Sequence, residues 1–245
     1  FPEIAGANIV TLTATRSPSS VTIENNTTST YTFTGSAIAG SGTLTKRGTG
    51  VTTLDVANSY TGTTTINGGG VIVNANNALG TADAGTTIAS GAALGLKGGV
   101  TYSTAEPIKG SGVANTVALG EFASVQRGLV QAITGACTFS GPIEINAAGF
   151  TRFGPQNGAS LTLSGPITRA TGVTGVQALF RTGTDGDYVT LSNSGNDWDL
   201  DTILFTGATG AAGGLRPRAR KHHPHRGRIL ARGRSGASLP PLLLD

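Results

Sequence analysis

The chain has 245 residues and a formal net charge of +4, with 38 glycines and only 12% charged residues, against about 25% in an ordinary soluble domain. No run approaches the roughly 18 apolar residues of a membrane-spanning helix, which excludes a helical transmembrane protein, and the single cysteine, Cys137, excludes an internal disulfide and a cysteine-based metal site. Abundant glycine and threonine, with few runs of Lys, Glu or Leu, favour many short strands joined by tight turns.

The charge divides the chain into two compositional parts. Residues 1–212 contain nine Lys or Arg against twelve Asp or Glu, whereas residues 213–245 contain eight Lys or Arg and a single acidic residue. Basic tails often bind nucleic acid or a membrane surface. We expect a cap or irregular segment over 1–30, a β-helical repeat domain over 31–212, and a disordered basic tail over 213–245 that contributes little to the fold.

A short pattern occurs three times in the repeat domain, at residues 33–38, 139–143 and 163–167. Each copy has a large apolar residue, a hydroxyl residue and a glycine, and each ends on isoleucine. The last two copies are offset by 24 residues. A fixed period in this range indicates a solenoid, in which each repeat buries its face only against its neighbours.

Alternating apolar and polar residues lie between these copies, for example at 71–74, 86–89 and 159–163. Each run is short and is bounded by glycine or asparagine, as strand–turn–strand structure requires. Helical periodicity over ten or more residues appears nowhere in the sequence. The sequence therefore predicts an all-β parallel β-helix, with a β-sandwich as the alternative fold.

A longer pair of segments also aligns, residues 46–66 with residues 181–204. Both keep a leucine, an asparagine, an aromatic and an aliphatic residue in the same order: Leu54, Asn58, Tyr60 and Ile66 match Leu191, Asn196, Trp198 and Leu204. The asparagine and the aromatic residue keep their spacing, which favours a true repeat over chance similarity.

Residues 40–80 resemble the autotransporter-associated β-strand repeat, which is found in passenger regions of bacterial type V secreted proteins. The matching positions are Gly42, Leu44, Lys46, Gly48, Gly50, Leu54, Asn58, Tyr60, Thr61, Gly62, Thr64 and Ile66. Residues 181–204 resemble a degenerate second copy, with Leu200 where the family has glycine.

This resemblance implies a right-handed parallel β-helix on an exported chain, either secreted or displayed on the bacterial cell surface. Members of the family also have a signal peptide before the passenger and a translocator barrel after it. Neither is found in these residues, so we expect the sequence to be a fragment of a longer passenger protein.

The basic tail departs from the family where a further strand and an Ile-Pro turn are expected. Residues 221–225 read Lys-His-His-Pro-His. The codons for these residues, read one base later, allow Ser-Ile-Ile-Pro-Ile, which resembles the expected continuation. We hypothesise that the residues from about 216 onward are out-of-frame sequence, with a linker and a genuine basic arm as the alternatives.

Five carboxylates lie close together near the end of the repeat domain: Asp185, Asp187, Asp197, Asp199 and Asp201. Alternate residues of a strand point to one face, so the last three form a candidate ladder of carboxylates. Oxygen-only ligands suit Ca²⁺, and two carboxylates beside a groove can act as acid and base on a glycosidic bond. The third interpretation is a solvated edge of a coil.

Trp198 lies inside this cluster and is a candidate ligand-binding residue, although its match to Tyr60 favours packing within the repeat. Nucleophilic hydrolysis has little support, because residues 1–212 contain no Gly-x-Ser-x-Gly motif and no histidine to serve as a base.

These features predict a secreted or surface-displayed β-helical passenger fragment with a structural or adhesive role and weak multivalent binding to glycans or matrix. The alternative is a hydrolase that cleaves a polysaccharide or an ester through the carboxylates between Asp185 and Asp201. The missing catalytic motifs favour a protein without enzymatic activity, with calcium as the one candidate cofactor. We expect no specific nucleic-acid partner.

Overall fold

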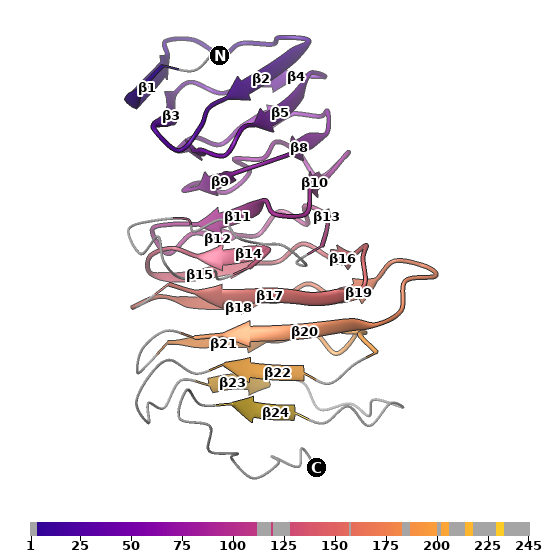
Figure 1. Cartoon of the computed structure of the whole chain (residues 1–245). Coiled ribbons are helices and arrows are strands. Elements are labelled where there is room, and N and C mark those ends of the chain that lie inside the picture. Colours follow the sequence, from indigo (N-terminus) through magenta and orange to yellow (C-terminus); the bar gives the residue numbers. More distant parts are fainter. Residues whose placement is uncertain are drawn as a thin grey trace.

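The computed structural model describes residues 4–111, 119, 128–156, 158–182, 187–199, 202–205, 214–217 and 229–232. These residues are all-β, without a helix, and form a parallel β-solenoid of about 7 turns. Figure 1 shows the coils stacked along one axis, with the N-terminus at the top and the later strands at the bottom. The predicted parallel β-helix is therefore confirmed, and the β-sandwich is not.

The first sheet contains ten of the described strands, which pair in parallel in chain order. They are β1 (Gly6–Leu12), β3 (Ser29–Gly35), β6 (Val51–Leu54), β9 (Gly70–Val73), β11 (Ala93–Leu96), β14 (Val130–Ala132), β17 (Gly149–Pro155), β20 (Val176–Arg181), β22 (Thr202–Phe205) and β24 (Ile229–Arg232).

The second sheet contains β2 (Ser20–Glu24), β5 (Thr43–Arg47), β8 (Thr64–Ile66), β10 (Thr86–Ile88), β13 (Ile108–Gly110), β16 (Ile143–Ile145) and β19 (Ile167–Arg169). The third contains β12 (Thr101–Tyr102), β15 (Ala136–Phe139), β18 (Ser160–Leu163), β21 (Tyr188–Leu191) and β23 (Gly214–Pro217). A short pair, β4 (Ala39–Gly40) and β7 (Ser59–Tyr60), completes the early coils.

The interior of the solenoid is filled by columns of apolar residues, one from each coil. In the first sheet the parallel register places Val10, Phe33, Leu54, Val73 and Leu96 directly above one another. Val10 in the first coil is half-buried and the other four are buried. Burying one such side chain contributes about 1.5–3 kcal/mol, so the period-2 alternation in the sequence fixes which face of each strand turns inward.

Glycine allows the tight turns between strands. Gly48 has φ +73°, and a Cβ added there would lie 2.2 Å from the main-chain oxygen of Asn25 in the preceding coil. Gly35 has φ +87° and the same close approach to Leu12. Only glycine accommodates both the left-handed conformation and a backbone neighbour this near.

Strands lie on both sides of the domain boundaries expected from composition. β1 and β2 fall within residues 1–30, and β23 and β24 fall within the basic tail, where they pair with β21 and β22. The rest of the tail, including residues 221–225, lies outside the described residues, so the disorder and out-of-frame hypotheses stay predictions. No helix in the described part of the chain is long and apolar enough to cross a membrane.

Candidate functional site

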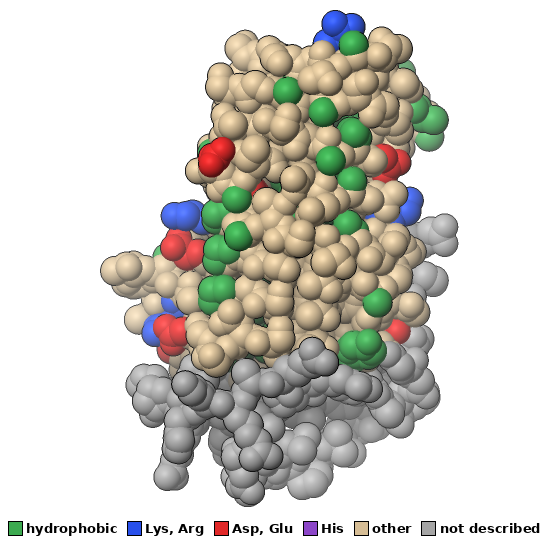
Figure 2. Space-filling view, turned by 180° about the vertical axis from the view of Figure 1, so that it is seen from behind, with side chains coloured by type: hydrophobic (Ala, Val, Ile, Leu, Met, Phe, Trp, Pro, Cys, Tyr) green, Lys and Arg blue, Asp and Glu red, His purple; other side chains and the backbone are tan. Residues whose placement is uncertain are grey.

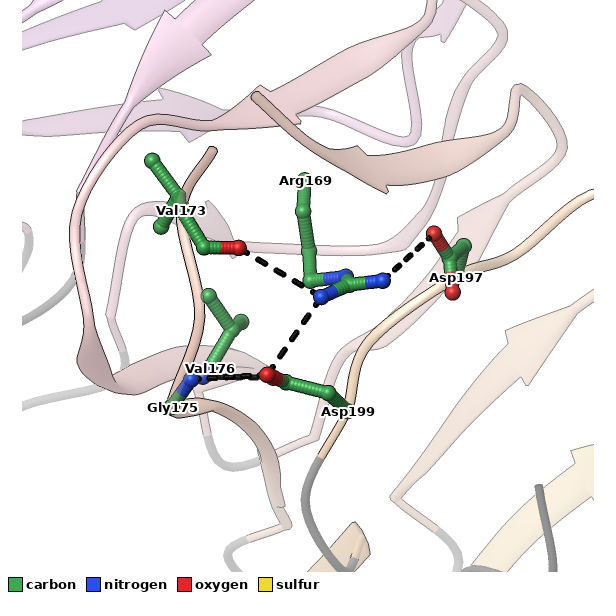
Figure 3. A network of polar contacts seen from close by, with 6 residues as sticks. All are labelled: Arg169, Val173, Gly175, Val176, Asp197 and Asp199. Carbon is green, nitrogen blue, oxygen red and sulfur yellow. Dashed lines mark hydrogen bonds and ion pairs between the residues drawn. The ribbon is translucent and has the colours of Figure 1, made fainter. Parts of the chain in front are cut away.

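Arg169, the last residue of β19, joins two of the predicted carboxylates. Its Nη2 lies 3.2 Å from Oδ2 of Asp197, and its Nη1 lies 3.3 Å from Oδ2 of Asp199 (Figure 3). Nη1 also donates a hydrogen bond to the main-chain oxygen of Val173 at 3.4 Å. The three charged side chains are 24%, 47% and 25% exposed, in the order Arg169, Asp197 and Asp199. Arg169 therefore forms ion pairs with both aspartates, and these ion pairs are partly shielded from solvent.

Asp199 also holds the start of β20. Its Oδ2 accepts a hydrogen bond from the N–H of Gly175, and its Oδ1 accepts one from the N–H of Val176, both at 2.7 Å. Partial burial acts to raise the pKa of Asp199, but these main-chain donors and the Arg169 guanidinium outweigh it and lower the pKa below its ordinary value. The carboxylate thus links the segment before β22 to the start of β20 in the preceding coil.

Two of the five predicted carboxylates are brought together, and a third is placed elsewhere. Asp187 is 2% exposed, and its Oδ1 accepts a hydrogen bond from the N–H of Gly158, in the turn between β17 and β18. Asp185 and Asp201 lie outside the described residues. Within the described ranges, no three His, Cys, Asp or Glu side chains are grouped as metal ligands. The calcium and hydrolase hypotheses, both of which include Asp185 or Asp201, stay predictions.

The sequence did not indicate Arg169, whose positive charge reduces the electrostatic repulsion between Asp197 and Asp199. The arginine precedes Asp197 by 28 residues, close to the 24-residue offset between the short patterns. Residues one coil apart in a solenoid lie side by side, so a basic residue roughly one coil before the aspartates is the relevant signal, but the 24-residue offset does not give its position because coil length varies.

Trp198 is packed into the repeat. Its ring lies against Phe180, with ring centroids 6.0 Å apart, and its Nε1–H donates a hydrogen bond to Oγ1 of Thr202 at 2.9 Å. The hydroxyl of Tyr60 makes the equivalent contact with Oγ1 of Thr64 at 2.7 Å. Each aromatic residue therefore bonds a threonine four residues later, as the alignment of the two segments implies.

The two aligned asparagines also have matching contacts. Oδ1 of Asn58 accepts a hydrogen bond from the N–H of Ile38, and Oδ1 of Asn196 accepts one from the N–H of Ile167, each at 2.8 Å. In both cases the asparagine binds the main chain of the coil before it. The asparagine and the aromatic residue together form a structural signature that occurs twice.

Residues 44–73, which contain the first copy of this signature, match the family described as passenger-associated transport repeat (PATR). The chain carries a PATR repeat. This repeat belongs to autotransporter passengers and implies secretion or surface display. No curated protein and no solved structure matches the chain significantly.

The PATR repeat runs from within β5 to the end of β9 and contains a buried lysine. Lys46 is 0% exposed, and its Nζ donates hydrogen bonds to the main-chain oxygens of Arg47 at 2.5 Å, Gly48 at 3.2 Å and Gly68 at 3.5 Å. Burial lowers the pKa of Lys46 from 10.5 to about 8, although the nearby Glu24 carboxylate acts to raise it. Lys46 therefore lies inside the solenoid and donates hydrogen bonds to main-chain carbonyl groups of the turns.

Proposed function

We propose that the chain is a structural and adhesive part of an autotransporter passenger, which makes weak multivalent contacts with glycans or matrix. The observation that supports this proposal is a column of threonines on the outer face of the second sheet. Thr22, Thr45, Thr65 and Thr87 are in register on four successive strands, and all four are exposed or half-exposed.

The column presents one hydroxyl group per coil, at the strand spacing of about 4.8 Å. It continues through an ion pair between Lys109 and Glu144, whose Nζ and Oε1 are 3.4 Å apart, to Thr168. Each hydroxyl group can donate and accept a hydrogen bond, and a glycan offers hydroxyls along its length. Contacts that are individually weak gain strength when many act on one polymer.

One face of the solenoid is sparse in charge. Figure 2 shows a face of the solenoid on which Lys, Arg, Asp and Glu side chains are few and lie mainly near its edges. The electric field of this surface would attract a strongly charged partner only weakly. It favours polar, uncharged ligands.

The test is binding of the purified chain to immobilised dextran, chitin, cellulose and collagen. On the polymer that binds best, we expect at least tenfold weaker binding to fragments of a few sugars or residues than to the intact polymer. Replacing Thr22, Thr45, Thr65 and Thr87 together by valine, which keeps the shape of each side chain, should remove most of the binding.

The matched control replaces Thr30, Thr32 and Thr53 by valine on the outer face of the first sheet, where the three are also exposed or half-exposed. This variant should bind like the wild type. The proposal is wrong if none of the four polymers binds, or if both variants lose binding equally. The contacts of Asp197 and Asp199 favour a structural role over the hydrolytic alternative.

A further inference from the structure

The corner between β12 and β13, residues 103–107, is attached to the preceding coil by exposed polar contacts. Asn76, in the β9–β10 connection, makes two hydrogen bonds with Ser103. Its Oδ1 accepts one from the N–H of Ser103, and its Nδ2 donates one to Oγ of Ser103, both at 3.0 Å. Oγ1 of Thr104 donates a hydrogen bond to Oδ1 of the adjacent Asn77. These contacts are accessible to water, so they contribute little on their own.

The inner side of the same corner contains a buried carboxyl group. Glu106 is 0% exposed, and its Oε1 accepts a hydrogen bond from Oγ1 of Thr86 at 2.7 Å. Its Oε2 is buried and has no hydrogen-bond partner among the described residues. The N–H of Thr86 donates to the main-chain oxygen of Pro107 at 2.8 Å, which joins the corner to β10. One neutral hydroxyl donor is little compensation for a buried negative charge.

Among the described residues, the titratable groups that face Glu106 are two phenols. The hydroxyl of Tyr60 is paired with Oγ1 of Thr64 at 2.7 Å, and the hydroxyl of Tyr102 accepts the N–H of Leu79 at 3.0 Å. Burial raises the pKa of both phenols, and the charge of Glu106 adds to that rise. Neither phenol supplies a positive charge that would stabilise the ionised carboxylate.

The charged residues of the surrounding elements are directed toward solvent. Lys109 on β13 and Glu144 on β16 form their ion pair on the outer face, where their side chains are 59% and 38% exposed. Asp83, in the β9–β10 connection, is exposed and accepts a hydrogen bond from Thr81. In the described part of these elements, no lysine or arginine faces Glu106.

We propose that Glu106 is a proton-controlled latch: the protonated carboxyl stays inside the coil and keeps residues 103–107 docked, and the ionised carboxylate drives this corner to open into solvent. Opening breaks the contacts of Ser103 with Asn76 and of Thr86 with Pro107. It therefore loosens the coil from its neighbour without unfolding the whole solenoid.

The direction of the pH dependence follows from the two states of the latch. Burial raises the pKa of Glu106 from 4.5 to about 7 in the docked state, although the Thr86 hydroxyl acts to lower it. In the open state the carboxyl regains its ordinary value. Between about pH 4.5 and 7 the open state releases its proton and the docked state keeps it. The opening equilibrium constant therefore rises by up to tenfold per pH unit over this range and levels off above about pH 7.

The test is amide hydrogen exchange of Ser103 and Thr86 at pH 5, 6, 7 and 8, corrected for the intrinsic exchange rate at each pH. In the wild type we expect the opening constant to rise about 40-fold from pH 5 to pH 7 and only about twofold from 7 to 8. Glu106→Gln, which keeps the shape and cannot ionise, should give a flat profile. Glu144→Gln, which removes an exposed carboxylate one coil later, should keep the wild-type profile.

Identical profiles for the wild type and Glu106→Gln would overturn the proposal, as would a flat wild-type profile. A ¹³C NMR titration of the Glu106 carboxyl in the wild type keeps the test decisive if Glu106→Gln does not fold. A midpoint near pH 7 supports the latch, and a midpoint near 4.5 refutes it.

Discussion

Asp197 and Asp199 already have a cationic partner within the chain. Arg169 contacts both carboxylates, and the main-chain donors of Gly175 and Val176 occupy the two oxygens of Asp199. The repulsion within the acidic cluster is therefore relieved without a metal ion, at least for these two residues. The two side chains differ in their contacts, which makes their separate replacement informative.

We predict that Asp199→Ala destabilises the solenoid more than Asp197→Ala, because only Asp199 binds the main chain at the start of β20. The pKa of Asp199 lies below its ordinary value of 3.8. The stability it contributes is present above pH 3.8 and is lost as the pH falls through its lowered pKa. Urea unfolding of both variants at pH 7 and at pH 3 measures this. Equal losses of stability in the two variants at pH 7 would contradict the role of Asp199 in holding the start of β20.

The calcium hypothesis for Asp197, Asp199 and Asp201 is tested separately, by measuring the melting temperature with and without Ca²⁺. A bound ion would stabilise the fold by about 2.7 kcal/mol at a hundredfold excess over its dissociation constant. Asp199→Asn together with Asp201→Asn would remove that gain. A melting temperature that is indifferent to Ca²⁺ in the wild type refutes the site.

At the scale of the element, an asparagine side chain can join three successive coils. Oδ1 of Asn58 binds the N–H of Ile38 in the coil before it, and its Nδ2 donates to the main-chain oxygen of Ala78 in the coil after it, at 2.7 Å. Asn196 has the first of these contacts, but its Nδ2 donates to Asn193 in its own turn. The first copy therefore links more of the stack than the second.

We predict that Asn58→Ala lowers the free energy of unfolding by about 2–6 kcal/mol, since two buried main-chain groups lose their partners at about 1–3 kcal/mol each. Asn196→Ala should cost about half as much, because one of its two contacts is local. Urea unfolding monitored by circular dichroism at 218 nm checks both values. A larger loss of unfolding free energy for Asn196→Ala than for Asn58→Ala would contradict this prediction, because it would show that contacts between coils do not determine the contribution of each asparagine.

The sequence predicted the solenoid because short-range features determine it. Alternation at 86–89 places side chains inward on β10, and the aligned asparagines and aromatic residues have equivalent contacts. Arg169 and Glu106 could not be located in this way, because coil length varies. Val51 pairs with Gly70, 19 residues on, whereas Leu94 pairs with Val130, 36 residues on. A single period therefore does not give the neighbours of a side chain in the next coil.

At the scale of the whole molecule, the solenoid has no centre, and each coil is stabilised by the coils beside it. β23 and β24 extend this arrangement into the basic tail, through backbone pairing with β21 and β22. Residues 216–236 still have eight Lys or Arg, and their only large apolar residues are Ile229 and Leu230. Such a segment buries little surface to offset about 1–2 kcal/mol of backbone entropy per residue.

We predict that limited trypsin digestion removes the tail before any other segment and leaves a folded core that ends near residue 213. Mass spectrometry of the digest identifies the boundary, and circular dichroism of the product tests whether the strands survive. Lys46, which is enclosed in the core, is an internal control and should remain uncut. Protection of the arginines between 216 and 234 would show that the pairing of β23 and β24 is strong enough to hold the tail.

The parallel ladders also determine how the protein responds to tension. Their hydrogen bonds run along the axis of the stack, so a pull on the two ends separates adjacent coils one ladder at a time instead of shearing many bonds at once. A coil such as the one between Thr30 and its register partner Val51 holds 21 residues, which extend by roughly 70 Å when released. A passenger built in this way would lengthen in discrete steps under fluid drag and limit the force on its weak surface contacts.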